Sequence, residues 1–373
     1  MDTYDKLKLL SRDSQYDLAC SCGNNNQINR KRGDEGKWLY PLTLPQGGTS
    51  VLMKTLLSNV CSNDCKYCPL RSKTNVHRCT LQPEEVAKVF MDYIARKKVF
   101  GLFLSSGVIN NPDFTMDRLN AVARILRYRH KFKGYIHLKV IPGASDAAIE
   151  DSLSLASAVS LNIETPGASH FKLLSEKKNY NEDIIHPLKL LGKLTSKGMK
   201  YSRVKITSQF IVGASDESDK EIVNYMSGMY DRLNFNRLYF SSYQKGLGDE
   251  SIPGENNFQL TSDQIFTREH RLYQVDFLLR KYGFSKEDII CDSNGNLNLD
   301  TDPKQIWADN HPEFFPVKIN SADKLELLRV PGLGSINANR IIKFRKKGRI
   351  SSFYNLNIKG KLLEKVKKYA IIN

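Results

Sequence analysis

Three cysteines within eight residues constrain this chain more than any other feature. They are Cys61, Cys65 and Cys68, in a CxxxCxxC spacing, and they follow an apolar segment at 51–57 that is typical of a strand. Three thiolates on one short loop can hold three irons of a 4Fe-4S cluster, because soft sulfur ligands suit such clusters. The spacing therefore predicts a cluster whose fourth iron stays open for a ligand.

Other uses of cysteine remain open. A zinc site completed by Cys79 would use the same thiols. A disulfide framework fits less well, because seven cysteines among 373 residues is an odd and sparse number and no signal peptide is visible. We therefore expect a cytoplasmic, reducing location. The remaining Cys20, Cys22, Cys79 and Cys291 can be read as a second cluster or metal site, although isolated cysteines are most often small buried apolar residues.

Length and charge limit the class of protein. The chain is long enough for a large domain and one smaller module, and no apolar run approaches the roughly 18 residues that cross a membrane. The formal net charge is +16, and residues 321–373 hold thirteen basic and three acidic residues, an excess of ten. This concentration favours a nucleic-acid-binding appendage, and a solvated lysine-rich helical tail is the plain alternative.

Apolar, β-branched segments alternate with amphipathic ones from about residue 50 to 245, which indicates repeated βα units. The expected strands lie at 51–57, 100–105, 135–141, 159–163, 204–212 and 237–242, and the expected helices at 83–97, 116–129, 183–197 and 217–232. The fold class is therefore α/β, a partial (β/α)6 barrel of the TIM-like kind. We expect an extension at 1–50 that packs on a barrel at 51–290, a linker at 291–320 and a small all-α module at 321–373.

Ligands collect at the carboxyl ends of the strands in such a barrel, and the cysteine loop follows the first of them. Small or polar residues also follow the later strands. Glu164 can accept hydrogen bonds from ribose hydroxyls or an amino group, and a surface cap or ion pair is its plain alternative. The predicted cofactor-binding residues are Tyr67, Ser105, Ser106, Gly107, Asn162, Glu164, Gln209 and Gly213.

The segment at 267–280 has a helical apolar pattern and many polar residues. His270 and Gln274 share a face, as do Arg271 and Gln274. We expect these three residues to bind substrate at the barrel mouth, and an ion-paired exposed face is the alternative.

The segment 327–342 reads as a helix, a tight hairpin and a second helix. Gly332 and Gly334 free the backbone for a turn whose amides can bind a phosphate at a helix N-terminus. Such contacts carry no base information. Contact with a protein is the alternative use of a helix-hairpin-helix. The predicted DNA-binding residues are Gly332, Gly334, Arg340, Lys343, Arg345, Lys346 and Lys347.

Over nearly its whole length the chain resembles a bacterial family of radical S-adenosylmethionine (SAM) proteins described as DNA modification or repair proteins. The resemblance covers segments 15–22, 102–107, 135–144, 268–280 and 311–313, the cysteine loop with Tyr67 before its last cysteine, and the hairpin. It implies reductive cleavage of SAM to methionine and a 5′-deoxyadenosyl radical. Segment 105–107 stands where such enzymes place a GGE-like segment, but this chain lacks the acid there.

The resemblance implies a 4Fe-4S cluster and SAM as cofactors, an electron donor such as flavodoxin or ferredoxin, and DNA as the partner, with RNA second. A radical SAM enzyme acting on a protein or small molecule is the leading alternative. A zinc-dependent nucleic-acid-binding protein without catalysis is another. No residue is assigned a catalytic role, and the substrate base and oligomeric state are not predicted.

Overall fold

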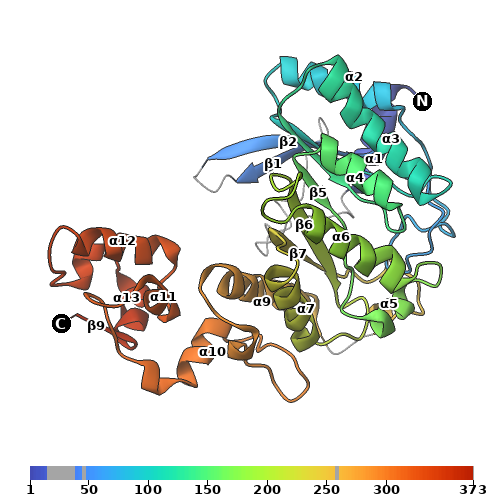
Figure 1. The fold of residues 1–373 in the computed structure, drawn as a ribbon. Coiled ribbons are helices and arrows are strands. Elements are labelled where there is room, and N and C mark those ends of the chain that lie inside the picture. The colour runs from blue at the N-terminus through green and yellow to red at the C-terminus, as the bar shows by residue number, and fades with distance from the viewer. Residues whose placement is uncertain (15–37, 44–47, 257–259, 373) are drawn as a thin grey trace. The chain divides into compact units, whose positions relative to one another are not determined.

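The computed structural model describes residues 1–14, 38–43, 48–256 and 260–372 (Figure 1). Its contacts divide the chain into two compact units: residues 1–217 with 228–269, and residues 218–227 with 270–373. Cys20 and Cys22, and with them segment 15–22, lie outside the described residues.

The first unit is built on a curled seven-stranded sheet in the order β1-β2-β3-β4-β5-β6-β7. The strands are β1 (Leu39–Thr43), β2 (Thr49–Leu56), β3 (Gly101–Ser105), β4 (Tyr135–Lys139), β5 (Ala158–Ser160), β6 (Lys205–Val212) and β7 (Arg237–Ser242). Strands β2 to β7 pair in parallel, so the predicted six-stranded half-barrel is confirmed. Strand β1, which the sequence did not predict, adds an antiparallel edge to β2.

Helices follow the strands along the outside of the sheet (Figure 1). They are α2 (Pro83–Ala95), α3 (Pro112–Arg124), α4 (Asp146–Leu155), α5 (Ala168–Leu174) and α6 (His186–Leu194), after an initial α1 (Thr3–Asp13). Helix α7 (Asp219–Asp231) follows β6 in the chain, and its residues 219–227 belong to the second unit. The start of α2 is set by Pro83 in its first turn and by a capping box between Gln82 and Glu85. Two π-helical segments, η3 (Ile125–Arg129) and η4 (Tyr180–Ile185), precede β4 and α6, and α8 (Pro253–Asn256) and α9 (Ser262–Lys281) come after β7.

The two faces of the sheet differ in chemistry. Side chains alternate between faces along a strand, and residues paired across parallel strands point to the same side. Leu102, Leu104, Ile136, Leu138 and Val159 form the face toward the helices and are fully buried. The opposite face carries polar and aromatic residues, among them Lys54, Phe103 and His137, which the register places in one row.

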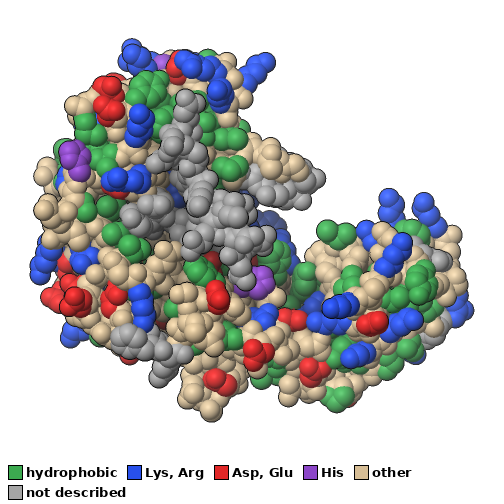
Figure 2. Space-filling model, turned by 180° about the vertical axis from the view of Figure 1, so that it is seen from behind, with side chains coloured by type: hydrophobic (Ala, Val, Ile, Leu, Met, Phe, Trp, Pro, Cys, Tyr) green, Lys and Arg blue, Asp and Glu red, His purple; other side chains and the backbone are tan. Residues whose placement is uncertain are grey.

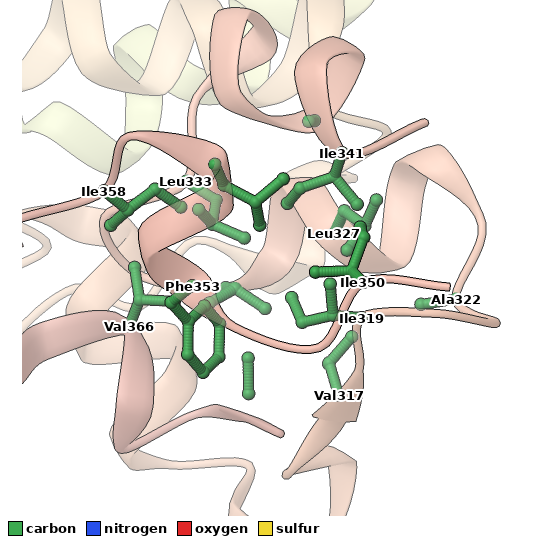
Figure 3. Packing of buried hydrophobic residues seen from close by; sticks show 14 of the residues in the cluster. Val317, Ile319, Ala322, Leu327, Leu333, Ile341, Ile350, Phe353, Ile358 and Val366 are labelled. Atoms are coloured by element: carbon green, nitrogen blue, oxygen red, sulfur yellow. The ribbon is translucent and has the colours of Figure 1, made fainter. Parts of the chain in front are cut away.

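The second unit is mainly helical. It contains η5 (Lys286–Asp288), α10 (Pro303–Asp309), η6 (Pro312–Phe314), β8 (Val317–Lys318), α11 (Lys324–Arg329), α12 (Ser335–Arg345), η7 (Phe353–Leu356), α13 (Gly360–Lys367) and β9 (Ala370–Ile371). Leu327, Leu333, Ile341, Phe353 and Val366 are buried together in its core (Figure 3). Strands β8 and β9 pair in parallel. Segment 291–320, which the sequence predicts as a linker, holds α10, η6 and β8.

The described helices include none that is both long and apolar enough to cross a membrane.

Candidate functional site: a cysteine loop on a half-barrel and a basic hairpin

The cysteine loop begins directly after β2 and is held against the end of β3. The Leu57 amide donates to Ser105 O at 2.7 Å, the Gly107 amide to Ser58 O at 2.7 Å, and the Ser62 amide to Val108 O at 2.9 Å. Gly107 is needed for this approach, because a Cβ there would lie 2.4 Å from Val60 O. The end of β3 therefore supports the loop itself.

The three thiols fit a cluster by their chemistry and surroundings. All three are free and partly exposed. The Val108 amide donates to Cys61 Sγ at 3.5 Å and the Leu70 amide to Cys68 Sγ at 3.4 Å, contacts of the kind that tune cluster sulfurs. Burial, together with the neighbouring thiols, raises the pKa of the Cys65 and Cys68 thiols. Iron that binds to such thiols deprotonates them, so a raised pKa does not prevent them from acting as ligands. Cys61, Cys65 and Cys68 would hold the cluster.

Cys79, the residue that would complete a zinc site, makes its hydrogen bonds to other parts of the chain. Cys79 Sγ is 3.9 Å from Lys6 O in α1, and the Cys79 amide binds Asn59 Oδ1 at 2.7 Å. Across the described ranges, no group of three or more His, Cys, Asp or Glu side chains is arranged to hold a single metal ion.

Glu164 joins the cysteine loop to the strand ends. Its Oε1 accepts a hydrogen bond from the Tyr67 hydroxyl at 2.6 Å, and its Oε2 accepts one from Asn162 Nδ2 at 3.4 Å. Glu164 is 4% exposed and has a φ of 68°, a strained backbone for a non-glycine residue and typical of functional sites. Burial and the nearby Glu164 carboxylate raise the pKa of Tyr67, which stays a donor. The structure thus brings together three of the predicted cofactor residues.

The other predicted cofactor residues lie in β3 and β6 or directly after these strands. Ser106 Oγ is buried and has no hydrogen-bond partner among the described residues. Gln209 O accepts the Glu164 amide at 3.1 Å, which anchors Glu164 to β6. Gly213, with a φ of 82°, donates its amide to Glu217 Oε1 at 2.6 Å. The backbone of Gly213 therefore helps to form the turn after β6.

Lys178 is a neighbour of the loop that the sequence did not indicate. Its side chain bonds to Cys65 and lies near Glu164. Burial alone would lower its pKa, but the Cys65 thiolate and Glu164 outweigh this and raise it. A permanent ammonium beside the thiols can offset their negative charge. One lysine in a lysine-rich segment gives no sequence signal for this position.

The predicted substrate residues of α9 belong to the second unit. Arg271 Nη1 donates to Gln274 Oε1 at 2.9 Å, and Arg271 Nη2 donates to Leu299 O at 2.7 Å. These contacts fasten α9 to the segment after it. His270 is exposed. Their contact with substrate stays a prediction.

The hairpin between α11 and α12 has the predicted form. Gly332 has a φ of 88°, and a Cβ there would lie 2.9 Å from Leu362 Cδ1, so this glycine is needed for both the turn and the packing on α13. Gly334 is the N-cap of α12, and no side chain caps that helix. The first amides of α12 are therefore not used by a cap and can bind an anion.

The predicted DNA-binding cations of the hairpin module fall into two groups. Arg340 Nη1 donates to Leu356 O at 2.9 Å, and Arg345 Nη1 donates to Ala322 O at 2.5 Å, so both guanidinium groups hold the module together. Lys343, Lys346 and Lys347 are exposed, as is Arg349. Lysine and arginine side chains stand out across this part of the surface (Figure 2).

Comparison with known proteins gives two family matches. Residues 55–227 match the radical SAM superfamily, and residues 314–369 match a helix-hairpin-helix motif. No curated protein sequence matches the chain.

Solved structures with a similar fold include the FeFe-hydrogenase maturase HydG from Carboxydothermus hydrogenoformans, at 16% identity and a TM-score of 0.48 over 61% of this chain and 51% of that one. Methylornithine synthase PylB matches at 13% identity and a TM-score of 0.46, over 60% of this chain and 62% of that one. The matched regions thus span about half to three fifths of these relatives' own lengths.

Members of the matched superfamily use a 4Fe-4S cluster and SAM, and the three cysteines of the loop supply the ligand set that such a cluster needs. Residues 55–227 therefore form a radical SAM domain, whose superfamily uses a 4Fe-4S cluster and SAM, and residues 314–369 contain a helix-hairpin-helix motif.

Proposed function

We propose that this chain is a radical SAM enzyme that modifies or repairs DNA, with the helix-hairpin-helix module holding the duplex and the half-barrel performing the chemistry. The observation that carries the proposal is the combination, in one chain, of the cysteine loop with a hairpin module that has uncapped helix amides at the start of α12 and exposed cations at the end of that helix. A flavodoxin or ferredoxin would supply the electron.

The residues of the half-barrel have separable tasks in this proposal. With the cluster and SAM bound, one-electron reductive cleavage of SAM would supply a radical that abstracts hydrogen from the substrate. Cys61, Cys65 and Cys68 hold the cluster. Glu164 orients SAM by accepting hydrogen bonds, and Tyr67 fixes the Glu164 carboxylate through its 2.6 Å bond. Ser106 offers a buried hydroxyl without a partner in the described part of the chain.

The charge pattern of the hairpin module supports DNA as the partner. Phosphate contacts by backbone amides and lysines bind nucleic acid without reading sequence. Such a module positions the duplex and leaves the choice of base to the half-barrel. Four exposed cations lie at the C-terminal end of α12 and directly after it: Lys343, Lys346, Lys347 and Arg349.

Salt-dependent binding tests this assignment. Neutralising four phosphates gives a log-log slope of affinity against salt of roughly −0.9 per contact, or about −3.6. Replacing the four exposed cations by glutamine should remove most of that slope, as measured by fluorescence anisotropy on a labelled duplex. A control that replaces the exposed Lys189, Lys193 and Lys197 by glutamine should keep it.

Two results would contradict the proposal. One is duplex affinity that does not change when the four cations are removed. The other is a slope that falls equally in the control, which would mean that net charge alone governs binding. A single-stranded RNA of the same length, bound more tightly than the duplex, would redirect the proposal to RNA.

A further inference from the structure

The segment directly after α5 is fastened to the cysteine loop through Asp64. The Asp64 carboxylate accepts hydrogen bonds from the Ser175 hydroxyl at 2.5 Å, from the Glu176 amide at 2.9 Å and from the Lys177 amide at 3.2 Å. Burial alone would raise the pKa of Asp64, but these hydrogen bonds outweigh it and lower the pKa, so the carboxylate stays ionised. Hydrogen bonds to an ionised acceptor are of the strong kind. We call this set of contacts the Asp64 clamp.

Further contacts join the same two segments. The Lys66 amide donates to Leu174 O at 2.8 Å, and the Lys66 ammonium pairs with the Glu176 carboxylate at 2.8 Å. Lys177 Nζ donates to Ser62 O at 2.6 Å. The segment after α5 is therefore attached to the cysteine loop at several points, which leaves the next residue of the chain little freedom.

That next residue, Lys178, lies beside the thiols. Its side chain is partly buried and interacts with Cys65, and Cys61 and Glu164 lie within electrostatic range of its ammonium. The ammonium is 5.2 Å from the centre of the buried Phe171 ring. A cation over an aromatic face is attracted electrostatically by the ring. Lys178 is therefore a positive charge held in one place, unlike a lysine that extends into solvent.

The charges around the thiols indicate what such a lysine can do. Cluster ligands bind as thiolates, and the Glu164 carboxylate adds a further negative charge to the same neighbourhood. Reduction by one electron makes this region still more negative. A fixed positive charge next to a ligand sulfur stabilises the reduced state more than the oxidised state, because its attraction grows with the negative charge that it faces. Such a charge therefore raises the reduction potential.

We propose that Lys178 tunes the cluster: its positive charge beside Cys65, held there by the Asp64 clamp, makes the cluster easier to reduce. In this role Asp64 is a positioning residue. One electron from a donor of the flavodoxin or ferredoxin class is taken up, no bond forms or breaks, and Lys178 keeps its proton throughout. The inference rests on the three cysteines as cluster ligands, and it does not depend on DNA as the substrate.

A redox titration of the reconstituted cluster without SAM, followed by electron paramagnetic resonance, tests the inference. We expect Lys178→Met to lower the equilibrium constant for reduction about tenfold or more, and tenfold is a shift of about 59 mV to more negative potential for one electron. Lys178→Arg keeps the charge and should stay near the unchanged enzyme. Lys172→Met removes an exposed lysine of α5 and should not shift the potential. Asp64→Asn weakens the clamp and should shift the potential in the same direction by less.

Four outcomes would overturn the inference. The first is an unchanged potential in Lys178→Met with full iron content; weaker SAM binding by that variant would then assign the ammonium to the SAM carboxylate. The second is an equal shift in Lys172→Met, which would mean that net charge alone sets the potential. If Lys178→Met retains no iron, Asp64→Asn decides, and an unchanged potential there is the third. Iron lost from both variants is the fourth, because it would show that the two residues only hold the loop.

The proposed function is tested separately. Duplex affinity, measured in parallel, should be the same in Lys178→Met and in the unchanged enzyme. If duplex binding fails and the potential shifts as expected, only the proposed DNA role is wrong. An unchanged enzyme that takes up no iron would overturn both the cluster ligands and the tuning.

Discussion

Removing the Glu164 carboxylate should weaken SAM binding and spare the cluster. In Glu164→Gln the side chain keeps its size, so the strained backbone at a φ of 68° and its bonds to β6 can persist. The charge that accepts the hydrogen bond from Tyr67 and interacts with Lys178 is lost. Losing a hydrogen bond to a charged group costs about 1.5 to 3 kcal/mol, so SAM affinity should fall roughly 10- to 150-fold.

Titration calorimetry of the anaerobically reconstituted protein with SAM measures this change. Tyr67→Phe is the matched control, because it removes the hydroxyl that fixes Glu164 and keeps the ring and the carboxylate. We expect Tyr67→Phe to weaken SAM binding by less than Glu164→Gln does. Unchanged SAM affinity in Glu164→Gln, with full iron content, would refute the assignment of Glu164 to SAM.

Three further results are expected. Alanine at Cys61, Cys65 or Cys68 should abolish iron and sulfide binding, whereas Cys79→Ala should leave both intact; stoichiometric zinc in the unchanged protein would contradict this. Burial lowers the pKa of Lys304 to about 7, below that of an unfolded lysine, so the unfolded state binds more protons between pH 7 and about 10. Stability should therefore rise by about 1 kcal/mol from pH 7 to 8, and denaturant melts of Lys304→Met should lack this increase. Arg340→Gln and Arg345→Gln should lower stability, because each guanidinium bonds to backbone carbonyls; duplex binding lost by the folded variants would instead make them direct contacts.

The half-barrel could be predicted because each strand leaves its own local pattern. The six parallel strands differ from the expected ranges by only a few residues. For β7 the observed range, Arg237–Ser242, is the expected one. Strand β1 could not be found in this way, because it is an edge strand defined by its pairing with β2. The segment before α6 forms the π-helical η4, which a helical periodicity does not distinguish from an α-helix.

The site was harder to predict than the fold, because it depends on contacts between distant residues. The spacing of the cysteines predicts the cluster loop, and the position of Glu164 directly after a predicted strand predicts its place in the site. Lys178 has no such sequence signal, because its position beside the loop follows from its contact with Cys65 in the folded chain. Net charge does not distinguish a cation that is free to bind phosphate from one that holds the module together. Arg340 and Arg345 are of the second kind, because they donate hydrogen bonds to carbonyls within the module.

The structure also changes how the module should be tested. Deleting residues from Ser321 onward would remove β9, the partner of β8, and the residues that pack on Val317. Bulky residues at Gly332 would collide with α13. Loss of DNA binding in either variant would reflect unfolding, so substitution of exposed cations is the cleaner perturbation.

The most direct test of the central claim is isotope transfer from DNA. The reconstituted enzyme, a reductant and SAM would be incubated with deuterated duplex DNA, and the 5′-deoxyadenosine formed would be examined by mass spectrometry. If the chain is a radical SAM enzyme that acts on DNA, 5′-deoxyadenosine should carry deuterium, and Cys65→Ala should form none. Abundant 5′-deoxyadenosine without deuterium, at a rate that DNA does not change, would contradict the claim.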